Sequence, residues 1–208
     1  MILAAGRGER MKALTQHTPK SLLRVQGSYL IEFAIDALKR AGILDIVINI
    51  SYLGEQIKQV LGDGKQYGVS IIYSEEVERL ETGGGILKAL PLLGEKPFVV
   101  MSSDIITDYP LHQLPKQLAG LGHLVMVDNP LFHPKGDFGL YEGYLTLDHQ
   151  PALTYANIAV LHPHLFAGCA SRYFRLVELL VPAIKKRQLT GEYYQGKWHN
   201  IGEPADLT

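Results

Sequence analysis

Runs of branched apolar residues alternate with amphipathic segments over the first 130 residues. The strand-like runs are 1–5, 45–50, 69–74, 97–104 and 123–129, and the helix-like segments are 29–42, 53–64 and 83–94. The run 45–50 is apolar almost throughout, which is typical of a strand covered on both faces. Strands that alternate with helices in this way predict a parallel α/β sheet with right-handed crossovers.

The pattern changes after residue 130. Residues 138–147 predict a hairpin that turns near Glu142 and Gly143, and residues 153–163 predict another strand. A long amphipathic helix is expected over 172–188, kinked at Pro182. No linker separates the two parts, so we expect one domain over 1–208 whose second part is mixed or antiparallel.

Composition limits the classes of partner. The chain of 208 residues has a formal net charge of -1, which offers no overall basic field for nucleic acid or a membrane. We therefore expect neither partner, and any bound anion must be held by local residues. The single Cys169 fits a reducing, cytoplasmic compartment, and the lack of a heptad favours a monomer. The abrupt apolar start and helix-like end lead us to expect a missing terminal segment.

The stretch "AAGRGERMKALTQHTPKSLL" over 4–23 has the residues of an anion site. Gly6 and Gly8 let backbone N–H groups approach an anion, and Arg10 and Lys20 supply positive charge. This loop follows one predicted strand and Asp104 ends another, so we expect them at the same sheet edge. A dinucleotide fingerprint is disfavoured because Met11 takes the third glycine position, and no P-loop motif is present. A solvated turn with incidental charges remains the alternative.

The same stretch resembles the signature of sugar-1-phosphate nucleotidyltransferases, which is close to LAxGxGxRxxPLTxxxPKxLL. Three further segments, 80–94, 123–140 and 191–204, resemble the branch that transfers uridylate to N-acetylmuramate 1-phosphate in cell-wall recycling. The resemblance implies a Rossmann-like nucleotidyltransferase fold, with a mixed, mainly parallel central sheet flanked by helices. It also implies a nucleotide-binding half over about 1–130 and a sugar-phosphate half over about 131–208.

The resemblance implies transfer of a nucleoside monophosphate, uridylyl from UTP, to a sugar 1-phosphate with release of pyrophosphate. The implied catalytic residues are Arg10 on the pyrophosphate, Lys20 between the two reacting phosphates, and Asp104 as a ligand of Mg²⁺. The other implied nucleotide contacts are Ala5, Gly6, Gly8, Glu81, Gly83 and Gly84, and the implied sugar contacts are Asp137, Gly139 and Asn157. Ordinary helix capping at Glu81 is the competing interpretation.

Several positions depart from the family pattern. Asn200 in "WHNIG" stands where relatives have a second metal-binding aspartate, so the expected metal pair is Asp104 and Asn200. Ser103 stands where relatives have glycine and threatens to crowd the nucleotide. Two hypotheses follow: an active Mg²⁺-dependent uridylyltransferase, or a catalytically weakened relative that binds nucleotide or sugar phosphate. An asparagine introduced at position 200 in place of a natural aspartate is a further hypothesis, and guanylyl transfer to mannose 1-phosphate is the runner-up activity.

Overall fold

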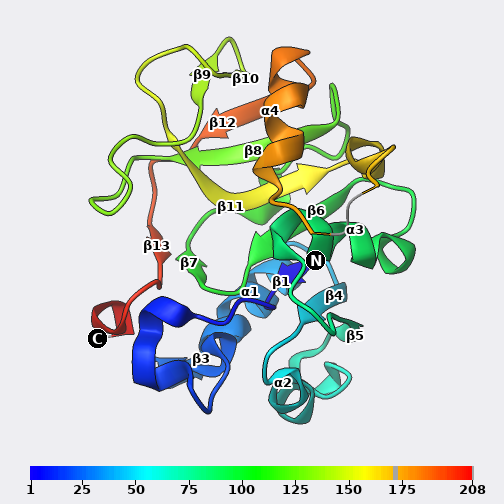
Figure 1. The fold of residues 1–208 in the computed structure, drawn as a ribbon, viewed down its shortest axis with the longest axis vertical. Helices are drawn as coiled ribbons and strands as arrows, with labels where there is room; N and C mark the ends of the chain where they lie inside the picture. The colour runs from blue at the N-terminus through cyan, green and yellow to red at the C-terminus, as the bar shows by residue number, and fades with distance from the viewer. Residues whose placement is uncertain (171–172, 208) are drawn as a thin grey trace.

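The computed structural model describes residues 1–170 and 173–207 and is built on a nine-stranded sheet (Figure 1). The strand order is β5-β4-β1-β6-β11-β8-β12-β10-β9. The strands are β1 (Ile2–Leu3), β4 (Asp45–Ile50), β5 (Ser70–Glu75), β6 (Phe98–Ser102), β8 (Gly122–Val127), β9 (Gly139–Tyr141), β10 (Tyr144–Thr146), β11 (Thr154–Leu161) and β12 (Leu189–Tyr193). Every strand predicted from the hydrophobic pattern is present.

The first four strands of the chain's main sheet are parallel, as predicted. β1 pairs in parallel with both β4 and β6, and β4 pairs in parallel with β5. β11 is antiparallel to both β6 and β8, and β12 is parallel to β8. β8 departs from the predicted strand–helix alternation, because β11 is inserted between it and β6 and no α-helix lies between β6 and β8.

In the described part of the chain, four α-helices cover the two faces of the sheet. α1 (Leu30–Arg40) and α2 (Gly54–Leu61) pack on one face, and α3 (Glu81–Leu93) and α4 (Val177–Lys185) pack on the other. Ile46 and Ile48 belong to the core under α1, whereas Val47 belongs to the core under α3. This alternation explains why β4 is apolar on both sides. No helix in the described part of the chain is long and apolar enough to cross a bilayer.

α4 is shorter than predicted. The expected helix was 172–188, of which residue 172 lies outside the described residues, and the observed helix is Val177–Lys185. Phe174, which precedes α4, does not contribute its carbonyl to the helix. That carbonyl accepts hydrogen bonds from Gly83 and Gly84 at the start of α3. Arg187 has a left-handed backbone (φ 53°) that leads into β12. Pro182 lies within the helix, and a kink there stays a prediction.

A two-stranded sheet places the C-terminal segment beside the residues that follow β6. β7 (Ile105–Thr107) pairs antiparallel with β13 (Trp198–Asn200), and neither strand was predicted. The indole of Trp198 donates to the carbonyl of Ala156 at 3.0 Å, and the side chain packs against the core under α1. Figure 1 shows the C-terminal segment beside the opening loop, where Ile201 and Met11 share a small core. Residue 200 therefore lies next to the end of β6.

Because β4 is buried on both faces, we predict that two isoleucines on neighbouring strands differ greatly in how much they contribute to the free energy of unfolding. Ile48 is fully buried, whereas Ile72 on β5 is 51% exposed. Ile48→Ala should lower the free energy of unfolding by about 2–5 kcal/mol, because it leaves a cavity in a core that cannot fully collapse. Ile72→Ala should lower it by less than about 1 kcal/mol. Urea denaturation of both variants measures this, and equal losses would contradict the assigned faces.

Candidate active site

The opening loop packs tightly against Lys20. Gly8 has a left-handed backbone (φ 67°), and a Cβ atom there would lie 2.9 Å from the Cβ atom of Lys20. The Gly8 carbonyl accepts hydrogen bonds from the Met11 amide at 2.8 Å and the Thr15 hydroxyl at 2.9 Å. A side chain at Gly8 is therefore excluded by both conformation and space. A Cβ atom at Gly6 would meet nothing within 4 Å, so Gly6 borders open space.

Lys20 and Asp104 form an ion pair at the carboxyl edge of the sheet. The Lys20 ammonium donates to the Asp104 carboxylate, and the two side chains are only 13% and 21% exposed. The residues meet because β1 and β6 are adjacent and parallel, with Leu3 paired to Ser102. The predicted meeting of the opening loop with Asp104 is therefore observed.

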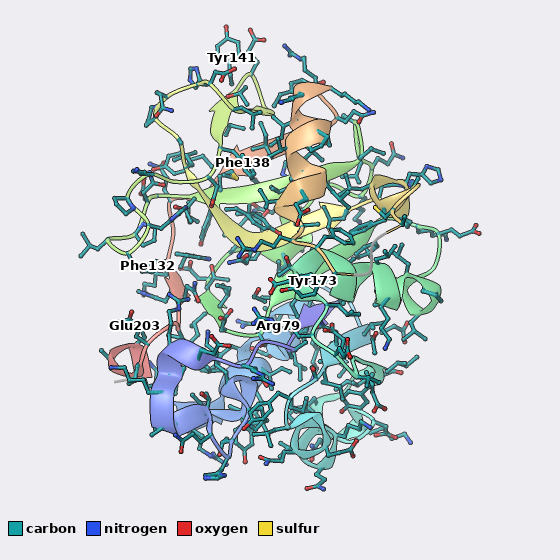
Figure 2. All side chains as sticks on the ribbon, in the orientation of Figure 1. Arg79, Phe132, Phe138, Tyr141, Tyr173 and Glu203 are labelled. Carbon is teal, nitrogen blue, oxygen red and sulfur yellow. The ribbon has the colours of Figure 1, made fainter. Side chains whose placement is uncertain are left out.

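A cavity of about 340 Å³ lies over this ion pair. Its lining residues are Leu3, Ala4, Ala5, Gly6, Arg7, Gly8, Glu9, Arg10, Lys20, Ser21, Asn49, Glu76, Arg79, Glu81, Thr82, Ser102, Ser103, Asp104 and Gly202. The opening loop supplies three cations, Arg7, Arg10 and Lys20, and the segment before α3 supplies Arg79 (labelled in Figure 2). The same lining contains four acids, Glu9, Glu76, Glu81 and Asp104, and Lys20 pairs with Asp104 and Arg79 with Glu81. Arg7 and Arg10 have no ion-pair partner among the described residues, and these two cations suit a polyanionic ligand.

The surroundings of Asp104 fit a hard divalent cation. The amide oxygen Oδ1 of Asn200 is buried and has no hydrogen-bond partner among the described residues. Asn200 pairs with Ile105 across β13 and β7, directly after Asp104 in the chain. The Ile201 amide donates to the Asp104 carbonyl at 2.9 Å, which holds residue 200 near Asp104, although Asn200 itself lines neither cavity. A carboxylate and a nearby unsatisfied amide oxygen form a donor set that Mg²⁺ accepts, since this ion takes one or two carboxylates and keeps several waters. The described residues contain no cluster of three or more His, Cys, Asp or Glu that could hold a metal ion by itself.

A buried polar network that the sequence analysis missed forms the floor of the cavity. The Asn49 side chain accepts from the Ala4 amide at 2.9 Å and donates to the Glu76 carboxylate at 2.7 Å. Glu76 also accepts from the Leu80 amide at 3.1 Å. A Cβ atom at Gly85 would lie 2.5 Å from Glu76 Oε1, so α3 passes close to this network because residue 85 is glycine. The sequence signal for this network was Asn49, a polar residue near the end of the apolar run 45–50.

A second cavity, of about 280 Å³, adjoins the first. Its lining residues are Leu3, Glu81, Thr82, Asp137, Phe138, Tyr155, Asn157, Arg175, Leu176, Val177 and Leu180. Leu3, Glu81 and Thr82 line both cavities. The structure thus brings the predicted sugar contacts Asp137 and Asn157 together in one cavity, which adjoins the cavity that contains the ion pair. In Figure 2, Arg79 of the first cavity lies near the middle of the view and Phe138 of the second lies above it.

Two non-glycine residues of the second cavity have left-handed backbones. Glu81 has φ 60° at the start of α3, and Asn157 has φ 56° inside β11. The pairing of β11 with β8 shifts register between Tyr155 and Ala159, so Asn157 sits in a bulge. Such conformations cost about 1–3 kcal/mol each and are concentrated at ligand sites, where they re-aim a side chain.

Three predicted glycines pack against other parts of the protein. The amides of Gly83 and Gly84 donate to the Phe174 carbonyl, and a Cβ atom at Gly83 would lie 2.3 Å from the Phe174 ring. A Cβ atom at Gly139 would lie 2.3 Å from the His149 carbonyl oxygen. None of the three lines either cavity, and close packing of the chain accounts for Gly83 and Gly139. Their contact with a nucleotide or sugar stays a prediction.

Comparison with known proteins gives the family. Residues 1–144 match the family described as "Nucleotidyl transferase". The whole chain is 41% identical to the N-acetylmuramate alpha-1-phosphate uridylyltransferase of Neisseria meningitidis, over 94% of that relative. This chain belongs to the nucleotidyl transferase family. An enzyme of the same description from Caulobacter vibrioides is 30% identical over 98% of this chain and 91% of the relative.

Solved structures confirm the fold of this nucleotidyl transferase. A putative glucose-1-phosphate thymidylyltransferase of Bacillus anthracis superposes with a TM-score of 0.85 at 20% identity, covering 99% of this chain and 90% of that one. The inositol-1-phosphate CTP transferase of T. maritima gives a TM-score of 0.81 at 19% identity, over 100% of this chain and 90% of that one. The expected Rossmann-like nucleotidyltransferase fold is therefore confirmed.

The buried carboxyl group of Glu76 makes the stability of this nucleotidyl transferase depend on pH. Burial raises the pKa of Glu76 above its ordinary value of 4.5, and the hydrogen bonds from Asn49 and Leu80 oppose this only in part. Above 4.5 the unfolded chain releases this proton more readily than the folded protein does. Folding stability from this group is therefore lost as the pH rises through the raised pKa.

Glu76→Gln removes this titration. Denaturation in urea between about pH 4 and 8 should show wild type losing stability relative to the variant as pH rises, because only wild type has to ionise a buried group. Glutamine has one acceptor oxygen where glutamate has two, so the variant also loses one of the hydrogen bonds from Asn49 and Leu80, but that loss is the same at every pH. A difference in unfolding free energy that stays constant with pH would contradict the assignment.

Proposed function

We propose that this nucleotidyl transferase transfers a uridylyl group from UTP to N-acetylmuramate α-1-phosphate and releases pyrophosphate. The observation that carries the proposal is the 41% identity to the Neisseria meningitidis uridylyltransferase over the whole of this chain. A mannose-1-phosphate guanyltransferase of Candida albicans is 29% identical, and this chain spans only 62% of it. Uridylyl transfer is therefore favoured over the guanylyl runner-up.

In the proposed reaction a phosphate oxygen of the sugar 1-phosphate attacks the α-phosphorus of UTP. A new P–O bond forms on that phosphorus, the bond to the oxygen that bridges to the β-phosphorus breaks, and pyrophosphate leaves. The protein's task in such chemistry is to position the two phosphates and to neutralise their charge. Arg10 and Lys20, which line the first cavity from the same loop, are suited to the pyrophosphate and the reacting phosphates respectively.

Mg²⁺ belongs to the same proposal, with Asp104 and the unsatisfied amide oxygen of Asn200 as its protein ligands. When bound, the ion would neutralise phosphate charge and polarise the P–O bonds. Lys20 and Asp104 are paired with each other, so an anion at Lys20 and a cation at Asp104 would replace one ion pair with two. This exchange favours entry of the nucleotide together with its metal.

The compartment and the oligomeric state are further parts of the proposal. A nucleoside triphosphate and a sugar phosphate are cytoplasmic metabolites, and the unpaired Cys169 suits a reducing compartment. We infer action in the cytoplasm, and the monomer stays a prediction from the sequence.

The role given to Lys20 predicts a specific loss of activity. Lys20→Met should lower pyrophosphate release from UTP and N-acetylmuramate α-1-phosphate about a hundredfold or more, because it removes the cation at the reacting phosphates. Lys65→Met is the matched control, since Lys65 is 88% exposed and lines neither cavity. Asp104→Ala sets the background.

The same assay decides between the competing functions. Release with UTP above the Asp104→Ala background, and not with GTP and mannose 1-phosphate, supports uridylyl transfer. Release only with GTP would reverse the assignment of the base. No release with any pair would identify a weakened binding relative, and thermal shifts with each nucleotide would then show which one it binds.

The proposed metal site predicts that a carboxylate at position 200 increases the affinity for Mg²⁺. Asn200→Asp should lower the Mg²⁺ concentration needed for half-maximal activity, because a second carboxylate raises the negative charge at the site. Without metal the same variant should melt at a lower temperature than wild type, since the new charge has no partner, and Mg²⁺ should restore it. A melting temperature that is independent of Mg²⁺ would place the ion elsewhere.

A further inference from the structure

The second cavity contains one cation among the described residues that line it, Arg175. The ionisable neighbours in the lining are the acids Glu81 and Asp137, and the remaining residues are apolar or neutral. A neutral sugar needs no positive charge at this place. A guanidinium in a cavity suited to a sugar therefore requires an explanation of its own.

The two acids of the cavity already have partners. Asp137 accepts from the Tyr155 amide at 2.8 Å and contacts His133 Nε2 at 3.0 Å. Glu81 contacts Arg79 Nη2 at 3.1 Å, whereas Arg175 Nε lies 4.0 Å from Glu81 Oε2. The contact of Arg175 with Glu81 is thus at the limit of an ion pair, and its side chain is 75% exposed. Its guanidinium retains donors for a ligand.

The backbone on both sides of Arg175 is fixed to the edge of the cavity. The Phe174 carbonyl accepts from Gly83 and Gly84, and the Leu176 amide donates to the Thr82 hydroxyl at 3.0 Å. The Arg175 amide itself donates to Glu178 at 2.7 Å in the first turn of α4. Figure 2 shows Tyr173, two residues earlier, between Phe138 and Arg79 in the view. The base of the side chain is therefore held near the junction of the two cavities.

We propose that Arg175 recognises the carboxylate of an acidic sugar and makes the enzyme prefer N-acetylmuramate 1-phosphate over the neutral N-acetylglucosamine 1-phosphate. The inference rests on the proposed function. The two sugars differ by a lactyl ether that ends in a carboxylate, and a guanidinium binds a carboxylate through two parallel hydrogen bonds. Because the cavities adjoin, one sugar phosphate reaches the Lys20 cavity with its phosphate and the Arg175 cavity with its carboxylate.

The test compares both sugar phosphates at saturating UTP. Arg175→Ala should lower kcat/KM for N-acetylmuramate α-1-phosphate about tenfold or more, and should change kcat/KM for N-acetylglucosamine α-1-phosphate by less than about threefold. Arg175→Lys should be intermediate, because it keeps the charge but loses the planar fork. Lys185→Ala, an exposed cation on α4 that lines neither cavity, should keep the wild-type ratio. The wild-type preference should also fall with added salt.

Each outcome decides the inference. If Arg175 had only a structural role, Arg175→Ala would lower kcat/KM equally for both sugar phosphates. An unchanged ratio of the two kcat/KM values therefore overturns the proposal. Failure of wild type to use either sugar overturns the proposed function instead. Calorimetric binding of N-acetylmuramate α-1-phosphate then decides separately: at least tenfold weaker binding by Arg175→Ala supports the carboxylate contact, and equal affinity overturns it.

Discussion

The parallel pairing of β1 with β6 is the constraint on which the site depends. Because the two strands run side by side in the same direction, the loop after β1 and the residue after β6 must emerge at the same edge of the sheet. Lys20 and Asp104 are 84 positions apart in the chain and still form a largely buried ion pair there. The glycine loop, the cation cluster and the C-terminal strand are all arranged around that pair.

Polar groups at this edge are held at a cost in stability. The Asn200 amide oxygen and the Ser21 hydroxyl are buried without hydrogen-bond partners among the described residues, and unsatisfied groups of this kind cost about 1–3 kcal/mol each. Glu76 is a buried acid, and Glu81 and Asn157 have left-handed backbones. These features lie in or beside the two adjoining cavities, whereas the cores under the helices are apolar. Their clustering is what a ligand site, and not a packing layer, requires.

Local patterns predicted the parallel half of the sheet well, because the apolar run 45–50 and the amphipathic segment 29–42 depend on near neighbours. Local patterns do not predict pairing between strands that are far apart in the chain. β13 is only three residues long and gains its stability from β7, nearly a hundred positions away, so its own sequence shows no strand period. The length of α4 was overestimated for the same reason, since the carbonyl of Phe174 is committed to α3.

Site residues that belong to one sequence motif could be predicted, whereas residues that only the fold brings to the cavities could not. The residues of the opening loop and Asp104 were identified from sequence, while Asn49, Glu76, Arg79 and Arg175 join the cavities only through strand order and helix placement. The central claim is that the first cavity holds the triphosphate. A crystal structure with UTP and Mg²⁺ tests it most directly: we predict the phosphates between the loop at Gly6–Gly8 and Asp104. Nucleotide bound elsewhere, with this cavity closed, would contradict the account.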